Sequence, residues 1–255
     1  MSGDLSAAFT QRVFLICVAS VLAIAAAHAQ TDDPVYRQID AAVYQRVDNV
    51  AGFTDTEKYS VYRGRDETHA AAEITVKMTY RRGVGRSYQI LSQSGSDLIR
   101  KFGLVPLLNA ETRLSEPGTL EHSWFTTDNY EMKLKSRQPE LLDGRQCYVL
   151  TIVPRHKAPN AIRGTLWVNA EDGSIVKVEG VASRRPSILA GSTSMMREYR
   201  KVNGYAMATH ARAESNSHII GRTVVTVEYN DYHLTFYPTP ASVAEDLIPT
   251  AGGED

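Results

Sequence analysis

Three dipeptides that favour tight hairpins constrain the fold of this chain more than any other feature. Asp143-Gly144, Asp172-Gly173 and Asn203-Gly204 each separate two stretches in which apolar and polar residues alternate. Asp-Gly and Asn-Gly favour type I′ turns, which need a positive φ at both central positions and join neighbouring antiparallel strands. The second half of the chain is therefore predicted to be an antiparallel meander.

The same alternation occurs earlier, in the stretch "EITVKMTYR", where Ile74, Val76, Met78 and Tyr80 share one face. Counting strands from Lys58 onward gives about eleven, and natural twist curls so large a sheet towards a barrel. We therefore expect a mainly antiparallel β fold, a half-open β-barrel of about eleven strands.

An N-terminal helix is predicted before the strands. Apolar residues recur at spacings of four, four, four and three, which is the stripe of one helical face. Asp33 can cap the helix, Pro34 suits its first position, and Gly52 is expected to end it. The apolar stripe consists of Val35, Ile39, Val43, Val47 and Val50.

A second helical segment is expected between Ser96 and Leu114, because its apolar residues fit one or two short helices interrupted around Gly103 and Pro106. The segment carries more apolar residues than one packed stripe needs. It is either a well-buried helix pair or a lid whose inner face meets lipid.

The first 29 residues have the pattern of a signal peptide. An apolar core from Val13 to Ala27 precedes Ala27-His28-Ala29, which places small residues where cleavage requires them. We expect cleavage after Ala29 and export to the periplasm. An uncleaved anchor is the alternative, although the apolar run is shorter than the roughly 20 residues that span a bilayer. The remaining chain is expected to comprise a half-barrel domain (30–237) and a flexible C-terminal tail (238–255).

Charge and cysteine content exclude two further classes. The formal net charge of −1 argues against nucleic-acid binding, which needs a concentrated basic face. After loss of the signal peptide Cys147 is the single cysteine, so no intramolecular disulfide is expected and a packed core must supply stability. Cys147 is predicted to be a buried, small hydrophobic side chain. The protein is expected to be a monomer.

Motifs of catalysis and of metal binding do not occur in the sequence. The histidines have no metal-ligand spacing, and no nucleophile elbow, P-loop or dinucleotide fingerprint is present. The sequence therefore predicts neither an enzyme, a cofactor nor a metal site.

A binding cavity is predicted from geometry instead. Two helical segments cannot cover the whole concave face of so large a sheet, which leaves space for an apolar cavity. Trp167 is assigned to it with an even choice between the cavity and the outer surface. The candidate lipid-binding residues are Ile74, Val76, Met78, Tyr80, Leu98, Phe102, Leu104, Leu107, Leu108, Met132, Leu134 and Trp167.

The stretch from Ala182 to Ser192 places basic residues beside apolar ones. Such a loop suits a membrane headgroup region or an acidic partner, and a solvated hairpin is the alternative. The candidate contact residues are Arg184, Arg185, Ile188 and Leu189.

The chain resembles the LolA/LolB-type carriers and bacterial outer membrane lipoprotein-sorting proteins. The resemblance lies in the order of elements and in the stretches "GTLWVNAEDGSIVKVEG", "REYRKVNGYAMATHARAES" and "GRTVVTVEYNDY". It implies a half-open barrel with a helical lid, a cavity for acyl chains, and an arginine that holds the lid shut, for which Arg63, Arg65 and Arg81 are candidates.

The expected function is that of a non-catalytic periplasmic carrier of lipid or lipoprotein acyl chains, with a membrane surface or a membrane-bound donor or acceptor protein as partner. The resemblance extends to periplasmic regulators of envelope-stress sigma factors. An envelope sensor domain that binds lipid and a protein partner is therefore the alternative.

Overall fold

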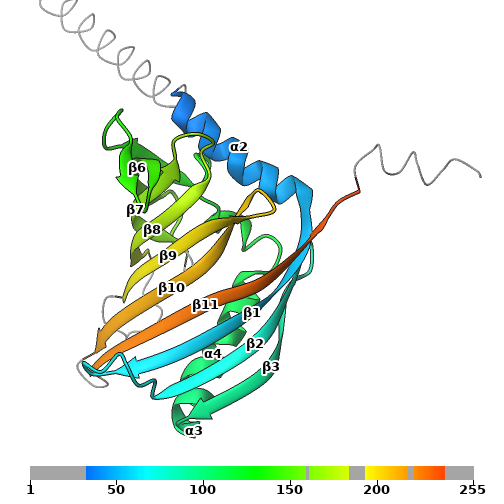
Figure 1. Cartoon of the computed structure of the whole chain (residues 1–255), viewed down its shortest axis with the longest axis vertical. Coiled ribbons are helices and arrows are strands. Elements are labelled where there is room, and N and C mark those ends of the chain that lie inside the picture. The colour runs from blue at the N-terminus through cyan, green and yellow to red at the C-terminus, as the bar shows by residue number, and fades with distance from the viewer. Residues whose placement is uncertain (1–32, 159–160, 184–192, 218–220, 239–255) are drawn as a thin grey trace, which may run out of the picture.

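The computed structural model describes residues 33–158, 161–183, 193–217 and 221–238. Within these ranges eleven antiparallel strands form one curved sheet, with helices on one side (Figure 1). The mainly antiparallel fold with an N-terminal helix is therefore confirmed. The elements are α2 (Pro34–Asn49), β1 (Val50–Arg63), β2 (Ala72–Arg81), β3 (Gly85–Gly95), α3 (Asp97–Ile99), the π-helix η1 (Arg100–Leu104), α4 (Val105–Leu114), the 3₁₀ helix η2 (Glu121–Ser123), β4 (Tyr130–Leu134), β5 (Glu140–Leu142), β6 (Arg145–Pro154), β7 (Ile162–Asn169), β8 (Ile175–Ala182), β9 (Thr193–Val202), β10 (Tyr205–Ser217) and β11 (Gly221–Phe236).

Several predictions from the sequence concern residues outside the described ranges. They are the signal peptide with its cleavage site after Ala29, nearly all of the tail 238–255, and the loop residues Arg184, Arg185, Ile188 and Leu189.

The strand order is β3-β2-β1-β11-β10-β9-β8-β7-β6-β4, with β5 paired to β6 beside β4. The last strand therefore lies next to the first, and β1 and β11 pair along nearly their whole length. The described sheet remains open, because β3 forms one edge and β4 with β5 the other.

Two of the three predicted hairpins have the expected turn. Positive φ occurs at both Asp143 and Gly144, and at both Asn203 and Gly204. At the third, only Gly173 has a positive φ, since the carboxylate of Asp172 accepts hydrogen bonds from Ser174 and shapes a longer loop. A side-chain turn of this kind replaces the type I′ geometry that the dipeptide favours.

Helix α2 begins as predicted, because Oδ1 of Asp33 accepts a hydrogen bond from the backbone N–H of Val35 at 3.0 Å. The predicted end at Gly52 was wrong. The helix ends at Asn49, and Val50 is the first residue of β1, where it pairs with Phe236.

The second helical segment was predicted to be interrupted around Gly103 and Pro106, but it contains a π-helical turn there instead of a break. Helix continues from α3 through η1 into α4, and the N–H of Val105 bonds to the carbonyl of Arg100, five residues back. This widened turn allows Pro106 to lie at the start of α4, where its missing N–H is least costly.

Two apolar cores lie on the helix-covered face of the sheet. The α2 core lies between α2 and strands β4 and β6–β8; the β2–α4 core lies between the α3–α4 segment and strands β1, β2 and β11. The α2 core comprises Val35, Tyr36, Ile39, Phe125, Tyr130, Met132, Leu150, Ile152, Ala161, Ile162, Leu166, Val168 and Val178. The β2–α4 core comprises Tyr59, Val61, Ala72, Ile74, Val76, Met78, Leu104, Leu108, Val227 and Tyr229. Cys147 is buried as a free thiol, as predicted.

Candidate functional site

The β2–α4 core has an apolar floor on the sheet and an apolar cover on the helix. Ile74, Val76 and Met78 project from alternate positions of β2 and are completely buried. Leu104 and Leu108, one turn apart, meet them from the helical side and are also buried. The spacing of two in the strand and four in the helix brings these faces together.

A buried ionic group, which we call the Arg86 cluster (Arg86, Glu57, Glu111 and Tyr59), joins α4 to this floor. The guanidinium of Arg86 in β3 forms ion pairs with Glu57 of β1 and with Glu111 of α4. The second pair has an Nη1–Oε2 distance of 3.2 Å. The cluster thus connects two strands with the helix.

The tyrosine of the cluster joins its two carboxyl groups. The hydroxyl of Tyr59 lies 2.6 Å from Oε2 of Glu57 and 2.7 Å from Oε2 of Glu111. Both oxygens are thus within hydrogen-bonding distance of this hydroxyl, which has one hydrogen to donate. Burial raises the pKa of Glu57, and nearby Glu111 raises it further, against the opposing effect of Arg86.

Arg86 itself stays charged in this environment. Burial alone would lower the pKa of its guanidinium, but the carboxylates of Glu57 and Glu111 outweigh that effect and raise it well above the usual value. Arg86 and Glu57 therefore form a buried ion pair. Removal of either residue would leave the charge of the other buried without this partner.

Asp55 is a further buried carboxyl beside the cluster. Its side chain is only 2% exposed, and neither oxygen has a hydrogen-bond partner among the described residues. Burial and the neighbouring Glu57 raise the pKa of Asp55 to about 7, although Arg86 acts in the opposite direction. Asp55 therefore changes charge near neutral pH.

The contacts that hold the end of α4 to β3 all involve side chains. The backbone N–H of Arg86 donates to Oγ of Ser115 at 2.8 Å, and the hydroxyl of Tyr88 donates to Oδ1 of Asn109 at 2.8 Å. Separation of α4 from the sheet would consequently leave the backbone ladders of the strands intact.

Six of the predicted lipid-binding residues come together at this core, although they pack against one another rather than lining an open cavity. Leu107 lies at its margin, and the other five fill it. Tyr80 is half-buried nearby, with its ring 5.2 Å from that of Phe53. The six residues are Ile74, Val76, Met78, Leu104, Leu107 and Leu108.

The remaining predicted residues lie elsewhere. Met132 belongs to the α2 core, and Leu134 packs at its margin. Leu98 and Phe102 point outward and are 67% and 76% exposed. Trp167 lies on the face opposite the α2 core, since its neighbours Leu166 and Val168 are in that core, and it packs under the ammonium of Lys177.

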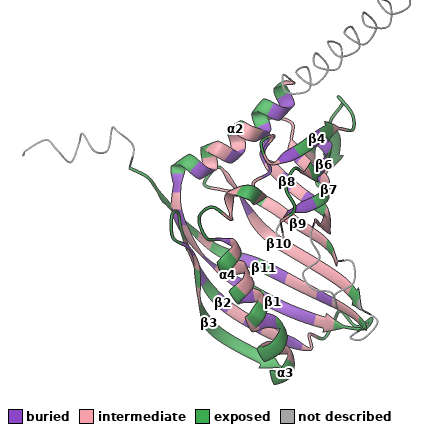
Figure 2. Cartoon of the chain, turned by 180° about the vertical axis from the view of Figure 1, so that it is seen from behind, coloured by how far each residue is buried: buried purple, intermediate pink, exposed green. Residues whose placement is uncertain are grey.

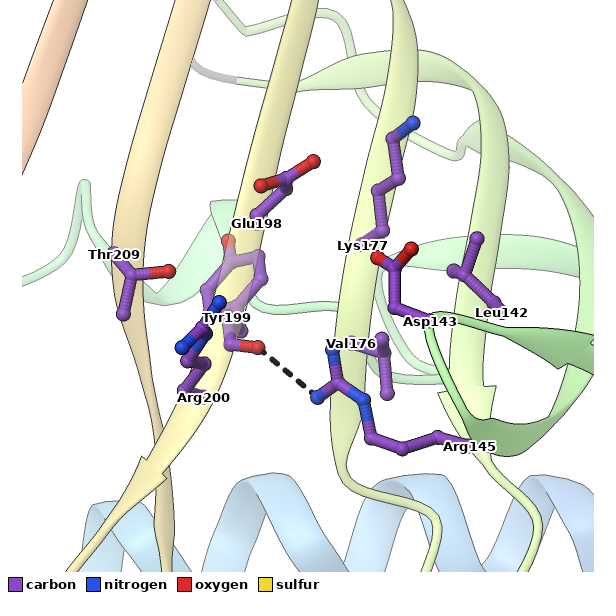
Figure 3. A pocket seen from close by; sticks show the side chains of 9 residues that line it. All are labelled: Leu142, Asp143, Arg145, Val176, Lys177, Glu198, Tyr199, Arg200 and Thr209. Carbon is purple, nitrogen blue, oxygen red and sulfur yellow. Dashed lines mark hydrogen bonds between the residues drawn. The ribbon is translucent and has the colours of Figure 1, made fainter.

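Two hollows on the described surface are polar. One of about 390 Å³ lies between β5–β6 and β8–β10 and contains both signs of charge, with Arg145 donating to the backbone carbonyl of Tyr199 (Figure 3). A second, of about 310 Å³, lies beside Asp33 and residues 133–137. Neither has the lining that an acyl chain requires.

Sequence reasoning missed the Arg86 cluster, although part of its signal was present. In "FTDTEKYSV" the carboxyls of Asp55 and Glu57 alternate in step with Phe53, Tyr59 and Val61. Acidic residues on an otherwise apolar strand face indicate buried partners. Arg86 pairs with Glu111 of α4, and the candidates Arg63, Arg65 and Arg81 did not include it.

Comparison with known proteins finds solved structures of low similarity to this chain. No protein-family model matches the sequence, and no curated protein matches it. Among solved structures, a LolA superfamily protein from Nitrosomonas europaea is 14% identical with a TM-score of 0.43, over 80% of this chain and 93% of its own. An outer membrane lipoprotein-sorting protein domain from Vibrio parahaemolyticus is 14% identical with a TM-score of 0.42, over 77% and 91%.

A DUF1329 family protein from Desulfovibrio piger is 15% identical with a TM-score of 0.41, over 82% of this chain and 96% of its own. Structural matches to LolA-type proteins are thus found, as the sequence resemblance implies, at low sequence identity. What those proteins do is not thereby assigned to this chain.

Within the described part of the chain, neither α2 nor any other helix combines the length and the hydropathy needed to cross a bilayer.

Proposed function

We propose that this chain is a non-catalytic periplasmic carrier of lipids or lipoproteins, which binds acyl chains between β1–β3 and the α3–α4 segment. The observation that supports it is the β2–α4 core, whose floor and cover are both apolar and whose cover is joined to β3 by side-chain contacts. An acyl chain would replace Leu104 and Leu108 on the floor when α4 moves away.

The energetics of such an exchange are favourable for long chains. Each buried methylene contributes about 0.8 kcal/mol, so a dozen carbons contribute about 10 kcal/mol without a specific polar contact. The Arg86 cluster opposes opening, because separation of Glu111 from Arg86 leaves two charges to be solvated again. In this proposal the closely packed β2–α4 core corresponds to the closed state of the carrier.

A matched pair of variants tests the proposal. Leu108→Ala shortens a side chain on the cover of the β2–α4 core, and Leu150→Ala makes the same change in the α2 core; both leucines are completely buried. Binding of a fluorescent long-chain fatty acid is measured by titration, and folding of each variant by circular dichroism. Leu108 packs on the floor only in the closed state, so its loss costs that state about 2–5 kcal/mol and the acyl-bound state much less, and Leu108→Ala should strengthen fatty-acid binding about tenfold or more.

Leu150→Ala should bind fatty acid like the parent protein. Equal binding by folded Leu108→Ala and the parent would exclude the proposed site, and a gain confined to Leu150→Ala would move the site beneath α2.

Export is a separate part of the proposal. The mature protein should begin at Gln30 and should be recovered in the periplasmic fraction, which N-terminal sequencing of that fraction tests. A protein retained in the membrane with Met1 still present would contradict it.

A further inference from the structure

The most exposed apolar pair on the helical cover lies on its outer side, away from the core. Leu98 of α3 is 67% exposed and Phe102 of η1 is 76% exposed. They lie four residues apart, and α3 is at the end of the molecule farthest from α2 (Figures 1 and 2). Figure 2 shows that this end of β3 and α3 is largely exposed.

The exposure is imposed by a well-defined turn. Gly95 has a φ of +73°, and an added Cβ there would lie 2.5 Å from the carbonyl oxygen of Ala71. Ser96 then donates its backbone N–H to the same carbonyl at 2.8 Å and caps α3 through its side chain. The direction in which the helix starts is therefore fixed.

The neighbouring charges leave a cation beside the apolar pair. Arg100 folds back onto the carbonyl of Gly95 and pairs with Asp97, so it covers neither apolar side chain. Lys101 is exposed and forms no salt bridge with any of the residues that the structure describes. An unpaired ammonium between an exposed leucine and an exposed phenylalanine suits the boundary between anionic headgroups and acyl chains.

We infer that the α3 tip, defined as Leu98, Lys101 and Phe102, docks on an anionic lipid surface. A protein partner fits less well, because a stable interface buries about 800 Å² from each partner, several times what two side chains expose. The free edge of β3 beside the tip keeps insertion shallow, since unpaired backbone groups do not enter hydrocarbon. The tip can dock whether or not the core accepts an acyl chain.

Vesicle flotation of the mature protein tests this inference. The probes are vesicles of pure phosphatidylcholine and vesicles of phosphatidylcholine mixed with phosphatidylglycerol. The Leu98→Ser/Phe102→Ser double variant should bind the mixed vesicles at least about tenfold more weakly than the parent. Lys101→Gln should lose about fivefold on the mixed vesicles and nothing on the pure ones.

The control is Val84→Ser/Leu141→Ser, which removes two side chains that are 71% and 69% exposed but lie away from the tip. It should bind like the parent. The inference fails if the tip variant binds mixed vesicles as the parent does. It also fails if the parent protein binds neither type of vesicle. That result would indicate that the α3 tip contacts a second copy of this chain or another protein instead. Neither outcome depends on fatty-acid binding, so the inference and the proposed function can fail separately.

Discussion

At the scale of single residues, Arg86 is the side chain on which the packing of α4 depends most. Its charge is shared between Glu57, which is completely buried, and Glu111. The partners are 29 and 25 residues away in sequence, so no local pattern indicates the pairs. The alternation in β1 places Asp55 and Glu57 on one face with apolar residues, but it does not show what they meet there.

Replacement of Arg86 by alanine should lower the free energy of unfolding by about 3 kcal/mol, because buried Glu57 and partly buried Glu111 both lose their ion pair with Arg86. Urea denaturation measures the change. Lys58→Ala, which breaks an ion pair with Glu73 at 2.8 Å on a largely exposed lysine, should cost less than about 1 kcal/mol. If both variants lost the same free energy of unfolding, the ion pairs of Arg86 would stabilise the protein no more than an exposed ion pair does.

Asp55 predicts a pH dependence of stability with a definite sign. An unfolded aspartate has a pKa near 3.9, whereas burial raises the pKa of folded Asp55 to about 7. Between these values the folded state binds more protons, so the contribution of Asp55 to stability is complete below about pH 4 and is lost as the pH rises to about 7.

Asp55→Asn removes this titration. The free energy of unfolding of the parent, minus that of the variant, should therefore fall by a few kcal/mol between about pH 5 and about pH 8. Denaturation curves at several pH values measure the difference. A difference that does not change with pH would mean that Asp55 titrates normally in the folded protein.

At the scale of elements, the strands and turns were largely predictable because alternation and turn dipeptides are local signals. The start of α2 was predictable for the same reason, through Asp33 and Pro34. Its end was not, because Val50 fits both a helical stripe and a strand until its partner Phe236 is known. The π-helical turn before Pro106 likewise depends on how the segment packs against β2 and β3.

The contact between the β7–β8 loop and α2 gives an element-scale prediction. An added Cβ at Gly173 would lie 2.5 Å from the backbone carbonyl of Gln38 in α2, and the φ of Gly173 is +70°. Gly173→Ala should therefore displace α2 and lower the free energy of unfolding by about 2 kcal/mol more than the backbone strain alone.

Gly204→Ala isolates that strain, since Gly204 has a φ of +86° and open space around an added Cβ. It should cost about 1–2 kcal/mol. Thermal or urea denaturation of the two variants gives the comparison, and equal losses would show that the loop does not constrain α2.

At the scale of the whole molecule, one sheet carries two separate cores, each under its own helical cover. The sequence predicted the sheet and both covers, and it assigned six residues of what is the β2–α4 core to a lipid-binding cavity. It could not predict that the covers fill their faces closely, because closeness of packing depends on side chains from strands far apart in sequence, such as Tyr59 and Val227. The outward direction of Leu98 and Phe102 depends on the same packing.

The proposed carrier function requires the β2–α4 core to open and accept an acyl chain. Native mass spectrometry of the mature protein tests this requirement most directly. Protein purified from the periplasm without detergent should carry a bound lipid or acylated peptide, or should gain the mass of an added long-chain fatty acid, and Leu108→Ala should raise that occupancy. A ligand-free mass that does not change when fatty acid is added would contradict the account.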